Sequence, residues 1–350
     1  GAIKPLPKAG LGESSNHAHM RDAPALEAKS VDAGYGRDAE GKPKTMVLRD
    51  VNVAIERGKT VGIIGESGCG KSTLARVFAG LLPPSDGGLK LDGESIAPDL
   101  RDRSREELRK VQFVYQMADT ALNPRQRIKD IIGRPLEFYG GLTGDAKNRR
   151  LLELLDMVEL PPPFAERYPH ELSGGQKQRV NLARALAADP EVVLCDEVTS
   201  ALDTIVGANV IELLKTLRRD TGVSFVFISH DLSTVASFAD EIVVLYAGRV
   251  AEQGPTDKVL SPPYHPYTRL LISSVPEMRT GWLEDTIASK ETITGMSGGV
   301  ELTDTGCPFF ARCPLAIEGT CDTQAPPRRI DGDDHVIECH REVDELLGGG

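Results

Sequence analysis

The feature that most constrains this chain is a glycine-rich segment that ends in a lysine and a serine. Residues Gly65–Ser72 match the pattern G-x-x-x-x-G-K-[ST]. A short β-branched run over residues 60–64 precedes the segment, and a helical pattern over residues 72–82 follows it. This order is typical of a phosphate-binding loop, in which backbone N–H groups face the phosphates. In such a loop Lys71 would reach the β- and γ-phosphates, and the Ser72 hydroxyl would bind Mg²⁺.

The pattern beyond this loop favours an α/β fold. Strands are predicted over residues 46–55, 60–64, 192–195 and 224–228, and helices over residues 148–160, 176–188 and 207–219. Short apolar strands that alternate with helices are typical of a mostly parallel sheet. We therefore predict three parts: a tail, linker or tag over residues 1–25, an α/β domain over residues 26–255, and a small C-terminal domain over residues 256–347.

Composition and charge exclude several classes of protein. With 40% hydrophobic and 27% charged residues, the chain is neither wholly disordered nor collagen-like. The net charge of −11 and the lack of a long basic run argue against non-specific nucleic-acid binding. No apolar stretch approaches the roughly 18 residues that a membrane-spanning helix needs. The sequence therefore predicts a soluble or peripheral protein that works inside the cell.

Two further motifs carry chemistry. Residues 192–197 form an apolar run that ends in Asp196 and Glu197, so that Asp196 could hold Mg²⁺ and Glu197 could orient an attacking water. A solvated acidic turn is the alternative. In residues 172–176, Ser173 is suited to cap the next helix, and two glycines follow it. This is a second helix N-terminus suited to an anion, which indicates assembly between two chains, because one nucleotide does not need both.

The motifs together resemble those of the nucleotide-binding subunit of an ABC (ATP-binding cassette) transporter, in the family's order, over about residues 26–255. The resemblance implies an ABC-type P-loop cassette with a parallel-sheet core, an antiparallel β region and a helical signature subdomain. It implies that ATP is bound by Tyr35, Gly65, Glu66, Ser67, Gly68, Cys69, Gly70, Lys71, Ser72, Thr73, Gln116, Ser173, Gly174, Gly175, Gln176 and Asp203. It assigns catalysis to Glu197, His230, Lys71 and Gln116, and Mg²⁺ binding to Ser72, Gln116 and Asp196.

The resemblance also implies a mechanism and partners. Two cassettes would pair head to tail, with ATP on the loop of one and the Ser173–Gln176 segment of the other above it. ATP binding would close the pair, and hydrolysis would open it. The expected partners are a second ATPase subunit, separate or in a fused chain, two membrane permeases and a solute-binding protein, with no nucleic acid. The expected location is peripheral, on the cytoplasmic face of the inner membrane.

The C-terminal part narrows the resemblance. Residues 261–268 read Ser-Pro-Pro-Tyr-His-Pro-Tyr-Thr and resemble the His-Pro-Tyr region of oligopeptide, dipeptide and nickel importer ATPases. This implies that the chain powers the import of oligopeptides or dipeptides. Two alternatives stay open. One is an ABC importer ATPase for another solute, such as a sugar, nickel or an opine-like compound. The other is a soluble ABC ATPase of DNA repair or translation.

Four cysteines lie near the C-terminus with the spacing C-x₅-C-x₇-C-x₁₇-C: Cys307, Cys313, Cys321 and Cys339. The chain shows no secretory signal, so the thiols are expected to be reduced, and a metal site is preferred to a disulfide framework. Four thiolates could hold a [4Fe–4S] cluster, which the resemblance also implies for some family members. Zinc is an alternative, although the close cysteine pairs that it usually favours are missing. Four free thiols that pack a small domain are the third possibility.

Overall fold

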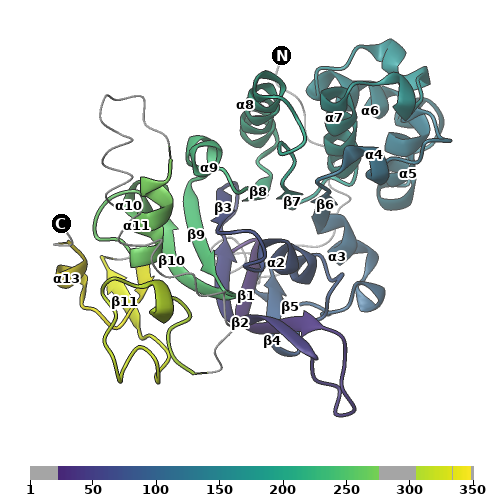
Figure 1. Cartoon of the computed structure of the whole chain (residues 1–350). Helices are drawn as coiled ribbons and strands as arrows, with labels where there is room; N and C mark the ends of the chain where they lie inside the picture. Colours follow the sequence, from purple (N-terminus) through teal and green to yellow (C-terminus); the bar gives the residue numbers. More distant parts are fainter. Residues whose placement is uncertain (1–22, 276–304, 333, 348–350) are drawn as a thin grey trace. The chain divides into compact units, whose positions relative to one another are not determined.

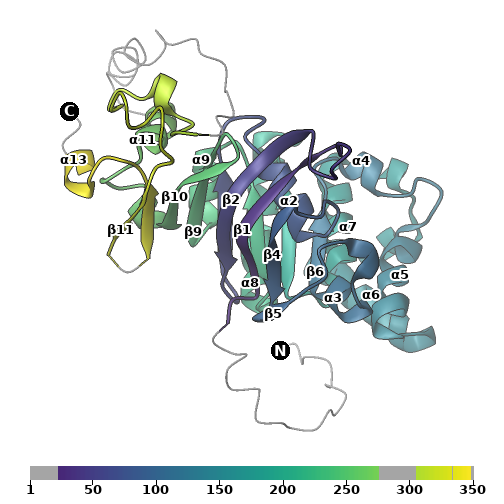
Figure 2. The same ribbon diagram turned by 90° about the horizontal axis from the view of Figure 1, so that it is seen from below.

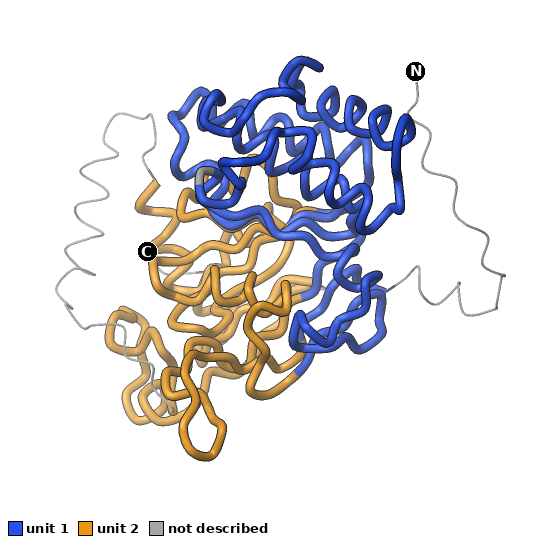
Figure 3. The backbone as a smooth tube through the Cα atoms, turned by 90° about the vertical axis from the view of Figure 1, so that its right-hand side faces the viewer, with its two compact units in different colours: residues 1–28, 54–59, 88–225 blue, residues 29–53, 60–87, 226–350 orange. Residues whose placement is uncertain are grey.

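A computed structural model describes residues 23–275, 305–332 and 334–347. The chain forms two compact units, shown in blue and orange in Figure 3. The first comprises residues 1–28, 54–59 and 88–225, and the second comprises residues 29–53, 60–87 and 226–350. The predicted tail, residues 1–25, falls almost wholly outside the described residues. The predicted division at residues 25 and 255 remains a prediction.

The first unit combines a parallel strand pair with a group of helices. Strand β6 (Val111–Val114) runs parallel to β7 (Val192–Asp196), with Val114 opposite Cys195. Figure 1 shows helices α5, α6 and α7 side by side. The other elements are β4 (Asp86–Leu91), β5 (Glu94–Ser95), η1 (Leu100–Asp102), α3 (Arg105–Lys110), α4 (Ala118–Ala121), α5 (Ile128–Gly140), α6 (Gly144–Met157), η2 (Pro162–Glu166), η3 (Pro169–Glu171), α7 (Gly174–Leu186) and α8 (Thr204–Thr221).

Helix α6 illustrates why this part of the sequence folds as it does. Its buried residues are Leu151, Leu154 and Leu155, at the i, i+3, i+4 spacing that places side chains on one helix face. The helix ends at Met157, shortly before three consecutive prolines at residues 161–163. Proline lacks the N–H that continues a helix, so the chain turns there. The helix predicted over residues 148–160 is therefore confirmed, with both ends shifted toward the N-terminus.

The second unit is organised around one sheet whose strands follow the order β11-β12-β10-β9-β3. Strand β3 (Thr60–Ile64) runs parallel to β9 (Glu241–Tyr246), and β10 (Arg249–Pro255) pairs antiparallel with β9. Figure 2 shows β11 and β10 near one another. The other elements are β1 (Leu26–Tyr35), β2 (Thr45–Ile55), α2 (Lys71–Phe78), β8 (Ser224–Ile228), α9 (Leu232–Phe238), α10 (Thr256–Val259), α11 (Pro266–Ser273), η4 (Phe310–Arg312), β11 (Arg328–Asp331), β12 (His335–Glu338) and α13 (Val343–Leu347).

The C-terminal residues extend this sheet and are tied to it by a buried hydrogen bond between His335 and Glu252. Strand β12 pairs antiparallel with β10, with Ile337 opposite Glu252. His335 Nε2 lies 2.7 Å from Glu252 Oε1, and both side chains are fully buried. Burial opposes the charged imidazole, but the hydrogen bond to Glu252 raises the pKa of His335. Glu252 also accepts from the N–H of His265, and His335 Nδ1 also bonds Asp331, so this buried network holds β12 against β10.

The predicted fold class is confirmed. Parallel pairing of β3 with β9 and of β6 with β7 gives the α/β character, and the antiparallel strands and the α5–α7 helices accompany it. The strands predicted over residues 60–64 and 224–228 are observed with the same bounds. In the parts of the chain that the structure describes, no helix combines the length and the apolar character needed to cross a membrane.

Candidate functional site

The glycine-rich loop lies in the second unit, between β3 and α2. All five residues of β3 are buried, and the chain leaves the strand at Gly65. Gly65, Gly68 and Gly70 have φ angles of 153°, 82° and 110°, which side-chain-bearing residues rarely adopt. A Cβ atom on Gly65 would lie 2.2 Å from the carbonyl oxygen of Leu245. The loop therefore needs glycine for its backbone conformation and for its close packing on β9.

Lys71 begins helix α2 and folds back over the loop. Its Nζ donates to the carbonyl oxygens of Gly65, at 2.7 Å, and Glu66, at 3.0 Å, and only 5% of the residue is exposed. The helix has no side-chain cap and no acidic residue in its first turn, where Ser72 and Thr73 follow Lys71. Its N-terminal N–H groups and the Lys71 ammonium thus give the loop the positive potential that binds phosphate.

Two loop residues have distinct environments. Ser67 and Gly68 are exposed at the tip. Cys69 is buried and packs close to Gly65, and its Sγ lies 3.9 Å from Lys71 Nζ. Burial raises the pKa of the Cys69 thiol. Cys69 is therefore a neutral packing residue of the loop.

Tyr35 lies beside the first turn of α2. Its hydroxyl is 3.2 Å from Thr73 Oγ1, and Arg76 Nη1 donates to it at 3.3 Å. The residue ends strand β1 and is 38% exposed. The structure thus places an exposed aromatic residue next to the phosphate loop, at the position predicted to stack on adenine.

His230 belongs to the same unit as the loop. It is exposed and lies two residues after the end of β8, at the carboxyl end of that strand. The next residue, Asp231, caps helix α9 by accepting from the N–H of Ser233 at 3.0 Å. His230 therefore occupies a defined bend between a buried strand and a capped helix.

The motif that ends in Asp196 and Glu197 lies in the first unit, where Glu197 contacts Gln116. Glu197 follows β7, and Gln116 lies two residues after the end of β6, so parallel pairing brings both to one sheet edge. Gln116 Nε2 donates to Glu197 Oε2 at 3.1 Å and to Ser200 Oγ at 3.0 Å. Asp196 is the last residue of β7. The amide of Gln116 thus orients the carboxylate predicted to act as the catalytic base.

The backbone of Glu197 is strained. Its φ angle is 48°, in the left-handed region that residues other than glycine rarely occupy. The turn is held by Ser200, whose N–H and hydroxyl both donate to the carbonyl oxygen of Glu197, at 3.1 and 2.9 Å. Such strain costs about 1–3 kcal/mol and persists where the surroundings enforce it, which is common at functional sites.

The predicted signature segment caps helix α7. Ser173 Oγ accepts from the N–H of Gln176 at 3.3 Å, and Gln176 Oε1 accepts from the N–H of Ser173 at 3.0 Å. These two bonds form a capping box. Gly174 and Gly175 lie in the first turn of the helix. Asp203 caps the neighbouring helix α8 by accepting from Ile205 and Val206.

Gly175 provides a sharp test of how closely these two helices pack. A Cβ on Gly175 would lie 2.5 Å from Val206 Cγ1, whereas a Cβ on Gly174 would lie 3.4 Å from Leu202 Cδ2. Replacing either glycine by Ala raises the helix propensity of α7 by a similar amount. Only Gly175→Ala places a methyl group too close to Val206. We expect Gly175→Ala to lower the free energy of unfolding by about 1–3 kcal/mol relative to Gly174→Ala, as measured by urea denaturation. Equal stability of the two variants would contradict the contact.

The four C-terminal cysteines lie close together, but as packed thiols. The N–H of Cys307 donates to the carbonyl of Cys321 at 2.6 Å, and Cys339 packs in a small core with Ile337 and Leu346. All are free, and burial, with a smaller contribution from neighbouring thiols, raises the pKa of Cys307 to about 11 and that of Cys313 to about 12.

The prediction of a metal at these cysteines is not supported. Among the described residues, no group of three or more His, Cys, Asp or Glu side chains is arranged to hold a metal ion. The described residues therefore support neither the [4Fe–4S] cluster nor its zinc alternative.

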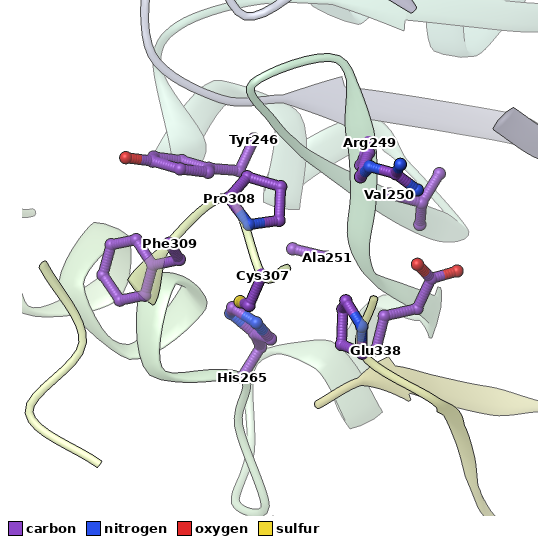
Figure 4. A pocket seen from close by; sticks show the side chains of 10 residues that line it. Tyr246, Arg249, Val250, Ala251, His265, Cys307, Pro308, Phe309 and Glu338 are labelled. Carbon is purple, nitrogen blue, oxygen red and sulfur yellow. The ribbon is translucent and has the colours of Figure 1, made fainter. Parts of the chain in front are cut away.

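A small pocket in the second unit is distinct from the phosphate loop. Its walls include Tyr246, His265, Cys307 and Phe309 (Figure 4). None of the residues predicted to bind ATP or Mg²⁺ lines it. Burial lowers the pKa of His265 to about 4, so its imidazole is neutral at pH 7. The pocket lies between β10 and the C-terminal residues.

Sequence reasoning missed two residues that contact the phosphate loop from the C-terminal part. Arg312 forms two hydrogen bonds to the Glu66 carboxylate, each of 2.9 Å. The N–H of Glu66 donates to the Tyr267 hydroxyl at 2.8 Å. Tyr267 is the tyrosine of the His-Pro-Tyr motif. The sequence revealed the motif but not the contact of Tyr267 with Glu66, which lies 201 positions earlier.

Comparisons with known families agree with these motifs. Residues 48–200 match the ABC transporter family, and residues 251–321 match the family described as the oligopeptide/dipeptide transporter C-terminal region. A Brucella abortus protein, named as a peptide import ATP-binding protein, is 41% identical over 89% of this chain and 91% of its own length. The di/tripeptide transport ATP-binding protein DppF of Pseudomonas aeruginosa is 38% identical over 88% of this chain and 94% of its own length. The oligopeptide transport ATP-binding protein AppF of Bacillus subtilis is 38% identical over 83% of this chain and 88% of its own length.

Solved structures give the same result. The cassette MJ0796, in a dimeric post-hydrolysis state bound to ADP and Pi, has a TM-score of 0.56 and 34% identity, over 66% of this chain and 98% of that chain. The protein cbiO1 of Clostridium perfringens is part of the ABC transporter complex cbiONQ. It has a TM-score of 0.61 and 26% identity, over 75% of this chain and 100% of that chain. The chain therefore belongs to the ATP-binding subunits of ABC transporters, and it is an ATPase that powers an importer.

Proposed function

We propose that this chain powers the import of oligopeptides or dipeptides. One observation carries the proposal: a cassette and an oligopeptide/dipeptide transporter C-terminal region occur in the same chain. The names of the relatives from Brucella abortus, Pseudomonas aeruginosa and Bacillus subtilis support the same substrate class.

Within the cassette, we assign binding of the triphosphate to residues 65–73 and stacking on adenine to Tyr35. Lys71 exchanges its two loop carbonyls for phosphate oxygens when ATP binds. The glycine-rich backbone and the N-terminus of α2 supply further donors. Ser173–Gln176 of a second cassette covers the nucleotide from above, and Asp203 holds the helix against which Gly175 packs. This arrangement explains why the chain carries two helix N-termini suited to an anion.

For the chemical step, we assign Glu197 as the base that accepts a proton from the attacking water. Gln116 holds the Glu197 carboxylate in place through its amide nitrogen. His230 and Lys71 stabilise negative charge that develops on the γ-phosphate. Ser72, Gln116 and Asp196 would hold Mg²⁺, because each offers the oxygen donor that this cation prefers, and bound Mg²⁺ would neutralise phosphate charge.

The proposed partners follow from the family. Two permease subunits form the path through the membrane, a second ATPase subunit completes the nucleotide sites, and a solute-binding protein delivers the peptide. The chain would act peripherally, at the cytoplasmic face of the inner membrane. In this assembly the permeases and the binding protein contact the solute, so we assign peptide selectivity to them.

Purification of this chain from its native membranes tests the proposed partners. A mild-detergent extract should yield the chain together with two permeases and a second cassette, identified by mass spectrometry. A binding protein from the same cells should carry bound peptide. Recovery of a complete transporter whose binding protein carries a sugar or nickel would refute the peptide assignment but not the ATPase. Recovery of the chain without any permease would refute the proposed partners.

A further inference from the structure

The C-terminal part of the second unit holds one residue of the phosphate loop, Glu66, at two points. The Glu66 carboxylate receives two parallel hydrogen bonds from the Arg312 guanidinium, Nη1 to Oε2 and Nη2 to Oε1, both of 2.9 Å. The backbone N–H of Glu66 donates to the Tyr267 hydroxyl at 2.8 Å. Bidentate Arg–carboxylate pairs are the strongest and most directional ion pairs in proteins. Glu66 is therefore fixed in both its side chain and its backbone.

An aromatic cluster holds both partners of Glu66 in place. The rings of Tyr246, Tyr267 and Phe309 contact one another, with centroid separations of 4.6 to 5.5 Å. Arg312 lies at the edge of the cluster, 5.8 Å from the centroids of Tyr246 and Phe309. Figure 4 shows Tyr246 and Phe309 next to each other. Tyr267 and Phe309 are almost completely buried, so the position of Arg312 is set by packed side chains.

The charge of Glu66 makes this contact relevant to nucleotide binding. A carboxylate in a loop that binds a polyphosphate repels it, because unit charges a few ångströms apart interact strongly near a protein surface. Lys71 Nζ donates to the backbone carbonyl oxygen of Glu66. Glu66 therefore lies next to the ammonium group that is expected to bind the β- and γ-phosphates. The Arg312 side chain is 19% exposed and that of Glu66 is 36% exposed, so solvent screens this charge only in part.

We propose that Arg312 and Tyr267 are positioning residues of the phosphate loop. Arg312 neutralises the Glu66 carboxylate and turns it toward the aromatic cluster, and Tyr267 anchors the backbone of the same residue. The C-terminal region thereby sets the affinity of the cassette for ATP. This inference rests on the assignment of residues 65–73 as the phosphate-binding loop, and it does not depend on the transported solute.

Removal of the Arg312 charge tests the proposal. Arg312→Met in the full chain should raise the Kd for a fluorescent ATP analogue by about tenfold, the order expected for one uncompensated charge near a polyanion. The Kd for the corresponding AMP analogue should stay unchanged, because AMP lacks the β- and γ-phosphates. The loss of ATP affinity should shrink when the salt concentration rises from 0.1 to about 1 M, since salt screens partly exposed charges. In the complete transporter, KM for ATP should rise more than kcat falls.

A double-mutant cycle separates neutralisation from simple structural support. In a Glu66→Gln background, Arg312→Met should cause no further loss of ATP affinity, because the charge that Arg312 offsets is gone. Arg312→Lys keeps the charge without the bidentate geometry and should lose less affinity than Arg312→Met. Arg329→Met is the matched control: Arg329 pairs with Glu342 at 2.9 Å in the same region and has no contact with the loop.

The outcomes distinguish this inference from the assignments on which it rests. Wild-type ATP affinity in Arg312→Met would overturn the inference alone. An equal loss of affinity in both Glu66 backgrounds would also overturn it, since Arg312 would then act only as support. If Arg312→Met does not fold, Arg312→Gln, which also removes the charge, takes its place, and wild-type ATP affinity in that variant would overturn the inference. If the wild-type chain binds no ATP analogue, the loop assignment itself fails.

Discussion

Glu197→Gln should lower the rate of ATP hydrolysis by at least about a hundredfold while ATP binding stays intact, since a positioned general base contributes roughly 10²- to 10⁴-fold. Gln has nearly the same size as Glu and can still accept the hydrogen bond that Gln116 donates at 3.1 Å. The turn held by Ser200 does not depend on the Glu197 side chain, because Ser200 bonds the backbone carbonyl. The substitution thus removes the base and leaves the loop conformation unchanged.

The measurement compares kcat of the assembled transporter with the Kd for ATP of the purified chain. Glu212→Gln is the matched control, because Glu212 is an exposed residue of α8 that pairs with Lys215 and lies outside the motifs. The control should hydrolyse ATP at the wild-type rate. Wild-type turnover in Glu197→Gln would remove Glu197 from the mechanism and would require another base.

Lys71→Met should abolish ATP binding, whereas Glu197→Gln should leave ATP binding intact. The buried ammonium is the charged side chain that lies over the phosphate loop, and it donates to two loop carbonyls before any nucleotide arrives. Met fills a similar volume but supplies no charge, so neither the β- nor the γ-phosphate is paired. We expect the Kd for ATP to rise by at least about a hundredfold, since hydrogen bonds to charged groups contribute about 1.5–3 kcal/mol each.

Titration with a fluorescent ATP analogue measures this effect, and Lys258→Met provides the control. Lys258 is an exposed lysine of α10 in the same unit and is not part of any motif. Its replacement should leave the Kd for ATP unchanged. If Lys71→Met binds ATP as tightly as the wild-type chain, residues 65–73 do not form the phosphate site.

Local features of the sequence were sufficient to predict the elements that carry the motifs. The apolar run at residues 60–64 forms a fully buried strand with the predicted bounds. The helix predicted over residues 207–219 begins earlier, at Thr204, because Asp203 caps it. The helix predicted over residues 176–188 likewise begins at Gly174, directly after its cap Ser173. Caps and apolar spacing are local, so a single sequence reveals them.

Contacts between distant residues could not be predicted in the same way. The ion pair between Glu66 and Arg312 joins residues 246 positions apart, and nothing in the spacing of either residue indicates it. The same holds for Glu252 and His335, whose pairing depends on the antiparallel register of β10 and β12. The metal prediction at the four cysteines is not supported: among the described residues, no group of three or more His, Cys, Asp or Glu side chains could hold a metal ion.

ATP-driven uptake of a labelled dipeptide tests the central claim most directly. The transporter that contains this chain is reconstituted in vesicles with its solute-binding protein, and uptake is measured with ATP on the side of the cassettes. We expect uptake that requires ATP, that is matched by phosphate release, and that disappears when this chain carries Glu197→Gln. Peptide uptake at the wild-type rate with the Glu197→Gln chain, or phosphate release without any peptide uptake, would contradict the account.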